Sequence, residues 1–191
     1  MPKSRIAIFA SGNGTNAEAI ITYFQGHPAI SVGAIFCNNP KAFVLERARK
    51  HNIRAVIFDR KMLYDSTDVL DLLNGLAITH VILAGFLWLL PEDLVRRYQS
   101  RIINIHPALL PKYGGKGMYG MRVHEAVVAS GDRETGITIH EVTTDYDDGP
   151  VIFKAACEVR PDDSPEVVAD RVHHLEHIHY PRVIEKWINN T

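Results

Sequence analysis

The chain has 191 residues, of which 46% are hydrophobic, with 21 Lys and Arg residues against 22 Asp and Glu residues. This length suits one domain, and a net charge of −1 lacks the basic excess of most nucleic-acid-binding proteins, so we expect no nucleic-acid partner. No run of about 20 apolar residues or signal-type cleavage site is present, so we expect no membrane association. Cys37 and Cys157 lack a CxxC spacing and are expected to be buried free thiols in a reducing cytoplasm.

Apolar runs and helical patterns alternate over the first hundred residues. Five short apolar runs predict strands, at residues 5–10, 30–37, 54–58, 80–84 and 102–105. Four segments predict helices, at residues 16–25, 42–51 and 62–76 and just after Pro91. This alternation favours right-handed crossovers and a parallel sheet, with ligands bound at the carboxyl ends of the strands.

The second half of the chain has a different pattern. A glycine-rich loop at 109–120 and a helix at 123–130 precede two strands, at 136–142 and 151–159, with no helix between them. A last helix, capped by residues 162–165, is expected to run to about residue 188. We therefore predict an α/β fold: a single-domain, Rossmann-like open sheet, mostly parallel, with an antiparallel C-terminal extension and helices on both faces.

A phosphate-type loop follows the first predicted strand. Residues 12–17 match the pattern G-x-G-x-x-A before a helix, whose N-terminal N–H groups favour an anion. A tight turn without a ligand is the alternative, because Gly, Asn and Thr are common in turns. A dinucleotide is disfavoured, because no carboxylate follows Cys37 to hold a ribose. A nucleotide triphosphatase is disfavoured as well, because the Gly-Lys-Ser/Thr ending of a P-loop is missing. A mononucleotide or a sugar phosphate remains open.

Asn104 and His106 form a candidate catalytic pair at the end of the fifth strand. Residues two apart project to the same side of an extended segment, and Pro107 restricts His106 to extended conformations. An amide and an imidazole side by side suit one carbonyl oxygen on which charge develops. The alternative is a polar strand end whose histidine is satisfied by the backbone.

An acidic turn at residues 144–150 separates the last two strands. It could be a solvated hairpin loop or a site for a hard cation, but its spacing is not that of an EF-hand, and no HExxH or paired-cysteine zinc motif occurs. We therefore expect no metal. His140, on the preceding strand, could orient a carboxylate across the turn.

Four motifs give the chain a nearly end-to-end resemblance to a known family: Ser11 to Asn16 (SGNGTN), Leu83 to Phe86 (LAGF), Asn104 to Tyr113 (NIHPALLPKY) and Asp147 to Ile152 (DDGPVI). The motif NIHPALLPKY is diagnostic of folate-dependent formyltransferases as a group. The motif SGNGTN distinguishes the members of that group from one another. The chain resembles the phosphoribosylglycinamide formyltransferases of purine biosynthesis. The resemblance implies transfer of the formyl group of 10-formyltetrahydrofolate, as co-substrate, to the amine of glycinamide ribonucleotide, without a metal. We expect a monomer or weak homodimer.

The resemblance also implies roles for individual residues. Asn104, His106 and Asp147 would be catalytic, with His140 beside Asp147. Asn104 and a protonated His106 would stabilise the oxyanion of the reaction, and Asp147 would favour the charged imidazolium. The substrate phosphate would bind at Gly14, Thr15 and Asn16, and Glu176 would contact the glycinamide substrate. The expected folate-binding residues are Lys61, Leu87, Trp88, Leu89, Leu90 and Asn104, with the segment 142–147 also near the pteridine. In this scheme residues 1–191 form one formyltransferase domain, with a phosphate-binding half at about 1–100 and a folate and catalytic half at about 101–191.

Two departures from the family pattern concern the site. After Tyr113 the family usually has a Pro-Gly-Leu-His-type stretch, whereas this chain has a glycine-rich segment at residues 114–121. Asp148 stands where Gly is common. We assign the catalytic role to Asp147, because it lies three residues before Pro150, as in the family motif.

The sequence favours this activity over three rival functions. A methionyl-tRNA formyltransferase should have a further nucleic-acid-binding domain and a basic surface, whereas this chain ends at Thr191 and is nearly neutral. A formyltetrahydrofolate hydrolase should have a regulatory domain and needs no phosphate loop. A non-catalytic sugar-phosphate-binding module would tolerate replacement of His106 and Asp147.

Overall fold

A seven-stranded sheet forms the centre of the computed structural model, which describes residues 4–190. The strands are β1 (Ser4–Ala10), β2 (Ile30–Cys37), β3 (Ala55–Ile57), β4 (His80–Leu83), β5 (Ile102–His106), β6 (Glu134–Glu141) and β7 (Val151–Glu158). Their order across the sheet is β3-β2-β1-β4-β5-β6-β7. The first five pair in parallel, whereas β6 and β7 are antiparallel. The predicted mixed sheet with its antiparallel extension is confirmed.

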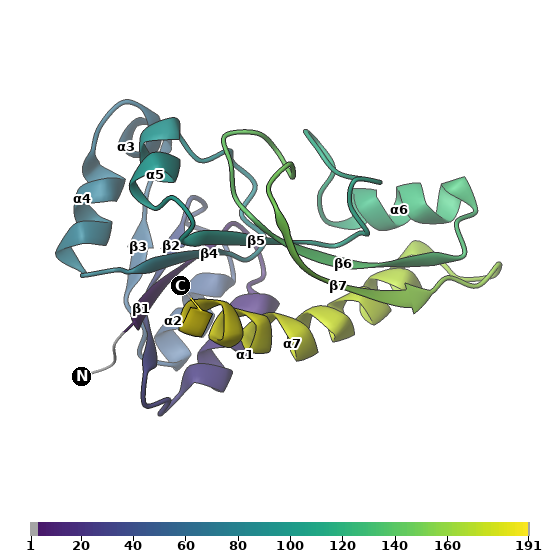
Figure 1. The fold of residues 1–191 in the computed structure, drawn as a ribbon, viewed down its shortest axis with the longest axis horizontal. Coiled ribbons are helices and arrows are strands. Elements are labelled where there is room, and N and C mark those ends of the chain that lie inside the picture. Colours follow the sequence, from purple (N-terminus) through teal and green to yellow (C-terminus); the bar gives the residue numbers. More distant parts are fainter. Residues whose placement is uncertain (1–3, 191) are drawn as a thin grey trace.

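Helices cover both faces of this sheet, as predicted (Figure 1). The helices are α1 (Thr15–Phe24), α2 (Val44–Lys50), α3 (Arg60–Tyr64), α4 (Asp68–Gly75), α5 (Glu92–Arg97), α6 (Met121–Ser130) and α7 (Pro165–Asn190). Helices α1, α2, α6 and α7 pack on one face, and α3, α4 and α5 pack on the other. No helix among residues 4–190 is long and apolar enough to cross a membrane.

The alternation of side chains along each strand builds two separate cores. In β1, Ile6 and Ile8 face the α1 and α7 side, whereas Ala7 and Phe9 face the α3 to α5 side. All four are completely buried. A strand buried on both faces needs a continuous apolar run, which is why β1 could be located from the sequence.

One predicted helix is wrong. The segment 62–76, expected as a single helix, is divided into α3 and α4. Polar side chains cause the interruption: the Ser66 hydroxyl donates to the Met62 carbonyl and accepts from the Asp68 N–H, and the Thr67 hydroxyl donates to Asp71. Ser and Thr compete for backbone hydrogen bonds in this way and favour helix ends over helix interiors.

The two thiols differ in exposure. Both cysteines are unpaired, but only Cys37 is buried; Cys157 is partly exposed. Cys157 lies on β7, an edge strand whose side chains alternate between partial and full exposure. The prediction of two buried thiols is therefore correct for Cys37 alone.

The strand order brings the sequence motifs together at the carboxyl ends of the central strands. Because β1 lies beside β4, the loops that follow these strands meet, and the Ser11 N–H donates to the Gly85 carbonyl at 3.0 Å. Because β5 pairs with β6, Asn104 lies directly opposite His140. The sheet register therefore places residues that are 36 positions apart in one site.

Candidate active site

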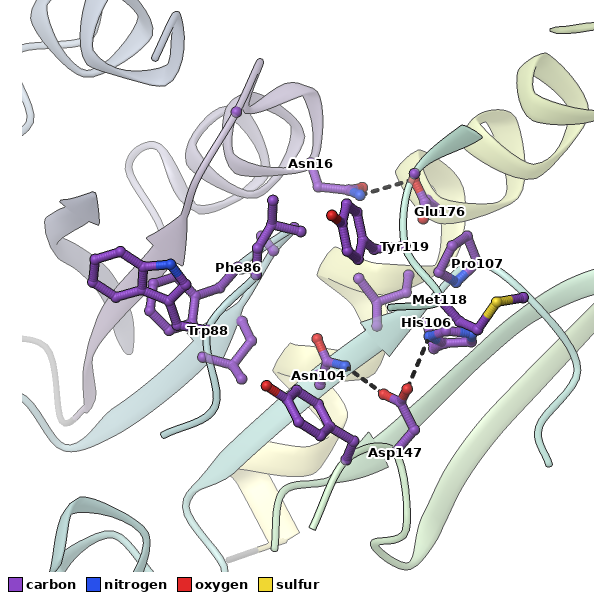
Figure 2. Close-up of a pocket in the computed structure, with 18 of the residues that line it drawn as sticks. Asn16, Phe86, Trp88, Asn104, His106, Pro107, Met118, Tyr119, Asp147 and Glu176 are labelled. Atoms are coloured by element: carbon purple, nitrogen blue, oxygen red, sulfur yellow. Dashed lines mark hydrogen bonds and ion pairs between the residues drawn. The ribbon is translucent and has the colours of Figure 1, made fainter. Parts of the chain in front are cut away.

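A cavity of about 400 Å³ opens at these strand ends (Figure 2). The phosphate-type loop and Glu176 line one end, and residues 86–90 line the other. Between them lie the four predicted catalytic residues, Asn104, His106, His140 and Asp147. The structure thus gathers, around one cavity, nearly all residues that the sequence assigned to the site.

Asp147 lies at the centre of the polar cluster. Its Oδ1 is 3.5 Å from the Nδ2 atom of Asn104 and 3.6 Å from the Nε2 atom of His140. Its Oδ2 is 3.5 Å from the Nδ1 atom of His106 and accepts a hydrogen bond of 2.9 Å from the Gly115 N–H. Only the Gly115 contact has the length of a strong hydrogen bond, so the carboxylate keeps acceptor capacity for a ligand or a water.

The Asn104 amide can still donate into the cavity. Its Nδ2 atom is 3.2 Å from His140 Nε2 and 3.5 Å from Asp147 Oδ1, and these two acceptors are 3.6 Å apart. The three atoms form a nearly equilateral triangle, whose angle at Nδ2 is much narrower than the spread of the two amide N–H bonds. One N–H therefore serves both acceptors, and the second remains available to a carbonyl oxygen.

Backbone contacts distinguish the two nitrogens of His106. Nε2 is 2.7 Å from the Tyr113 carbonyl, which can only accept, so Nε2 carries a proton. Nδ1 faces Asp147 at 3.5 Å and is the nitrogen that can exchange a proton. The ring is almost completely buried. A backbone carbonyl thus fixes the tautomer, an arrangement that commonly selects the reactive nitrogen of a histidine.

The ionisation of the pair differs from the sequence-based expectation. Burial lowers the pKa of His106, and although Asp147 and the Tyr113 carbonyl oppose this effect, the net pKa lies below the ordinary value. His106 is therefore neutral at pH 7, whereas we expected a protonated ring. Burial raises the pKa of Asp147, but the neighbouring His140 and His106 rings and the Gly115 N–H outweigh burial and lower it. Asp147 is thus ionised in the resting protein.

The turn before β7 positions Asp147 through its backbone. Asp147 has a φ of +53°, in the left-handed region that Asp adopts more readily than most residues. The backbone of Gly149, two residues later, passes close to the backbone of Glu141. A Cβ at Gly149 would lie 1.8 Å from the Glu141 carbonyl oxygen. Asp148, the alternative carboxylate, is exposed and does not line the cavity. The geometry accordingly favours Asp147 as the residue that acts.

The phosphate-type loop has the conformation of an anion site. Gly14 has a φ of +77° and precedes the ten-residue helix α1, whose first-turn N–H groups have no acceptor within the helix and can bind an anion. Thr15 and Asn16 also line the cavity. The Asn16 amide donates to Glu176 at 2.8 Å, while its Oδ1 is buried without a hydrogen-bond partner. A buried unpaired acceptor is costly, and a hydroxyl of a bound sugar would satisfy it.

Glu176 projects from α7 into the same end of the cavity (Figure 2). Burial raises its pKa, although the hydrogen bond from Asn16 and the nearby His173 act in the opposite direction. A carboxyl group with a raised pKa can both donate to and accept from a ligand hydroxyl or amine.

The opposite end of the cavity is apolar and aromatic. Leu87, Trp88, Leu89 and Leu90 line it, as predicted for the folate, together with Phe86 and Tyr146. The prediction for Lys61 is not matched by the structure: Lys61 is exposed on α3 and does not line the cavity. Its neighbour Arg60 instead lies 4.7 Å from the centre of the Trp88 ring.

Several residues of the site were not singled out from the sequence. The Tyr113 carbonyl and the Gly115 N–H hold the catalytic pair through the backbone, which leaves no signature in residue type. Tyr119, His124 and His173 also line the cavity. His124 and His173 belong to α6 and α7, whose packing could not be read from one sequence. Among residues 4–190, no group of three or more His, Cys, Asp or Glu side chains is arranged to hold a metal ion.

Comparisons with known proteins agree with this site. The family model for formyl transferases matches residues 4–184. The phosphoribosylglycinamide formyltransferase of Escherichia coli K12 is 38% identical over 185 residues, covering 94% of this chain and 84% of the relative. The chloroplastic enzyme of that name from Arabidopsis thaliana is 37% identical over 194 residues, covering 95% of this chain.

Solved structures give the same result. The crystal structure of phosphoribosylglycinamide formyltransferase from Bacillus halodurans is 35% identical, with a TM-score of 0.86, and the match covers 96% of this chain and 94% of that one. The chain described here belongs to the formyl transferase family. It spans 64% of the length of the Arabidopsis relative and 60% of that of the relative from Vigna unguiculata.

Proposed function

We propose that this chain is an enzyme that transfers the formyl group of 10-formyltetrahydrofolate to the amine of glycinamide ribonucleotide, a step of purine biosynthesis. The observation that carries the proposal is the position of the Asn104, His106 and Asp147 cluster, between an anion-binding loop and an aromatic pocket end. The names of its relatives support the choice of substrates. In this assignment the nucleotide phosphate binds at Gly14 to Asn16, and the folate lies along residues 87–90.

The reaction begins when the neutral amine attacks the formyl carbon. A C–N bond forms, and the carbonyl electrons move to oxygen and give a tetrahedral oxyanion. The free N–H of Asn104 donates to this oxygen, where a preorganised donor is typically worth 10²–10³ in rate. Glu176 contacts glycinamide ribonucleotide near the amine and the sugar of this substrate, so that the amine meets the formyl carbon in line. Positioning of this kind supplies a substantial part of the barrier reduction.

His106 and Asp147 move the proton. His106, neutral at rest, accepts the proton that the amine nitrogen loses, at Nδ1, directly or through a water held by Asp147. The resulting imidazolium lies between the Asp147 carboxylate and the oxyanion, both of which stabilise it. His106 then protonates N10 of the folate as the C–N10 bond breaks. This sequence needs no covalent intermediate, and no metal is assigned to it.

Further properties are part of the proposal. The unpaired thiols fit a cytoplasmic location. A monomer or weak homodimer remains the expected assembly. The division into a phosphate-binding half before residue 100 and a folate and catalytic half after it is only approximate. Residues 86–90 lie in the first half but line the end of the cavity that we assign to the folate.

The acceptor is tested by offering the purified chain 10-formyltetrahydrofolate together with glycinamide ribonucleotide, methionyl-tRNA or water. We expect rapid formyl transfer to glycinamide ribonucleotide, with tRNA formylation and hydrolysis slower by orders of magnitude. Preferred transfer to the tRNA or to water would assign the chain to one of the rival functions. Binding of both small molecules without transfer would indicate a non-catalytic module.

A further inference from the structure

Two acceptors compete for the single ring proton of neutral His106. The Tyr113 carbonyl is 2.7 Å from Nε2, and the ionised Asp147 carboxylate is 3.5 Å from Nδ1. A neutral imidazole has one N–H, and its hydrogen-bond partners decide which nitrogen carries it. A proton on Nδ1 would block the nitrogen that must accept a proton from the amine. The position of the Tyr113 carbonyl therefore decides whether His106 can act as the base.

Tyr113 presents this carbonyl from an unfavourable backbone conformation. Its φ is +58°, in the left-handed region, where a bulky residue other than glycine is rare. Such a conformation persists only where the surrounding contacts impose it, and it is concentrated at functional sites. If Tyr113 relaxed, its carbonyl would turn away from His106. The loop after β5 must therefore be anchored by other parts of the protein.

The Tyr113 side chain provides that anchor. Its hydroxyl donates to Asp132 Oδ2 at 2.7 Å and lies 2.6 Å from the hydroxyl oxygen of Ser130. The Lys112 ammonium also donates to both oxygens of Asp132, at 3.2 and 2.9 Å. The hydrogen bonds from Lys112 and Tyr113 lower the pKa of Asp132, so this carboxylate is ionised and is a strong acceptor.

The anchoring cluster lies outside the cavity. Ser130 is the last residue of α6, and Asp132 lies between α6 and β6, so the cluster ties the loop after β5 to a separate part of the fold. None of the side chains of Lys112, Tyr113, Ser130 and Asp132 lines the cavity. Any effect of Asp132 on the reaction must therefore pass through Tyr113 to His106.

We infer that Asp132 is a positioning residue for formyl transfer: it holds the Tyr113 hydroxyl, and Tyr113 thereby keeps its carbonyl on Nε2 of His106. Asp132 contacts neither substrate and moves no proton. It acts on the reaction through the tautomer of one imidazole. This inference rests on the proposed function, because it takes His106 to be the base. Loss of the Asp132 acceptor should therefore slow the chemical step while both substrates still bind.

Three variants test this series of contacts. Tyr113→Phe removes the hydroxyl and keeps the ring, and Asp132→Ala removes the acceptor. Asp132→Asn is the conservative variant, because its amide oxygen can still accept from the Tyr113 hydroxyl. Tyr23→Phe is the matched control: the Tyr23 hydroxyl also donates to a carboxylate on another element, that of Glu185, and Tyr23 does not line the cavity.

Two quantities are measured for each variant. Steady-state kinetics give kcat and KM for formyl transfer to glycinamide ribonucleotide. The ¹⁵N spectrum of the ligand-free protein shows which nitrogen of the His106 ring is protonated, and the signals of this ring are assigned by their loss in His106→Gln. The spectrum reports the tautomer independently of activity, so it separates a positioning role from a general loss of stability.

We expect kcat to fall roughly three- to tenfold in Tyr113→Phe and in Asp132→Ala, with KM within about twofold of the wild type, because part of one hydrogen bond is lost from the chemical step. The ring proton of His106 should shift partly from Nε2 to Nδ1 in both variants. The double variant should lose no more than either single variant, since both changes break the same contact. Asp132→Asn should regain most of the kcat, and Tyr23→Phe should match the wild type.

Wild-type kcat and tautomer in Tyr113→Phe would overturn the inference, as would a wild-type His106 ring protonated on Nδ1. A lower kcat with an unchanged tautomer would also overturn it, because the cluster would then have only a structural role. An equal loss of kcat in Tyr23→Phe would lead to the same conclusion. A wild type that transfers no formyl group would instead overturn the proposed function, and the ring spectrum would still show whether Asp132 sets the tautomer of His106.

Discussion

His106 shows how much of the chemistry depends on the surroundings of one side chain. The Tyr113 carbonyl holds Nε2 as a donor, so only Nδ1 can exchange a proton. Burial keeps the pKa of the ring below its ordinary value, despite the opposing effect of Asp147. A neutral imidazole is a competent base for an amine that is losing its proton. The same ring, once protonated, is stabilised by Asp147, so it can act as the acid later in the reaction.

The pH dependence of kcat/KM follows from this ionisation. His106 is already neutral at pH 7, and Asp147, with its lowered pKa, stays ionised over the whole range. The remaining group is the substrate amine, which should titrate near ~7.7–8.0 like a free α-amino group. We expect kcat/KM to increase about tenfold per pH unit below this range and to level off near ~pH 8–9.

Initial rates at a subsaturating acceptor concentration from pH 6 to 9 measure this profile. A kcat/KM that falls as the pH rises from 6.5 to 8 would show that the resting enzyme needs a protonated His106. That result would contradict the neutral resting state derived from burial.

Loops around the strand ends, more than the strands themselves, position the reactive groups. The turn before β7 places Asp147, and the segment after β5 supplies the Tyr113 carbonyl and the Gly115 N–H. Gly149 allows the turn to pass close to Glu141. Both loops are therefore held by backbone contacts that tolerate little change.

We expect Gly149→Ala to impair both stability and activity. Its Cβ would collide with the Glu141 carbonyl oxygen, and overpacking of this kind costs roughly 1–3 kcal/mol. The turn must shift to relieve the collision, which moves Asp147, so kcat should fall even where the variant is folded. Urea unfolding and steady-state kinetics measure the two effects.

Gly75→Ala is the matched control, because a Cβ at Gly75 meets no atom within 4 Å. It lies in α4, where Ala is the better helix former, so stability should be unchanged or higher. A Gly149→Ala enzyme with the stability and kcat of the wild type would show that the close approach to Glu141 has no functional role.

The elements that the sequence predicted well are those with a strong local pattern. The buried run of β1 and the loop before α1 are read directly from residue type, and the structure places both close to the expected positions. The break between α3 and α4 was missed, although the polar run at residues 65–68 (DSTD) interrupts the apolar pattern with residue types that favour helix ends. Backbone groups such as the Gly115 N–H could not be predicted, because every residue except proline supplies an N–H.

At the scale of the whole molecule, buried neutral histidines make folding sensitive to acid. Burial and the charge of Arg101 lower the pKa of His80 to about 4, and the pKa of His124 is lowered to about 4 as well. In the unfolded chain both should titrate near ~6.5. Between these values the unfolded state binds more protons, so the free energy of unfolding decreases as the pH falls from 6.5 toward 4.

Urea unfolding at pH 7.5 and pH 5.5 measures this loss. Each of the two histidines should contribute about 1 kcal/mol to the decrease. The variant His80→Gln, which cannot titrate, should lose about 1 kcal/mol less than the wild type over the same interval. His174→Gln, on the surface, should lose as much as the wild type. A full loss in His80→Gln would show that other groups cause the acid sensitivity.

The residues that form the site could be predicted from the sequence, whereas their ionisation states could not. The motif residues Asn104, His106 and Asp147 were identified in the sequence, and the strand order brings them around one cavity. Their ionisation could not be predicted, because it depends on burial by segments distant in the chain. The position of Lys61 relative to the cavity could not be predicted either: the family pattern placed this residue near the folate, and the structure leaves it exposed.

The central claim, that Asp147 works with His106 in formyl transfer, is tested most directly by single-turnover kinetics of Asp147→Asn. This variant keeps the size of the side chain and removes its charge, and Asp148→Asn, at an exposed position outside the cavity, is its control. We predict that the formyl-transfer rate constant falls roughly 10²–10⁴-fold in Asp147→Asn, with folate binding nearly unchanged, and stays near the wild-type value in Asp148→Asn. A fully active Asp147→Asn enzyme would contradict the account.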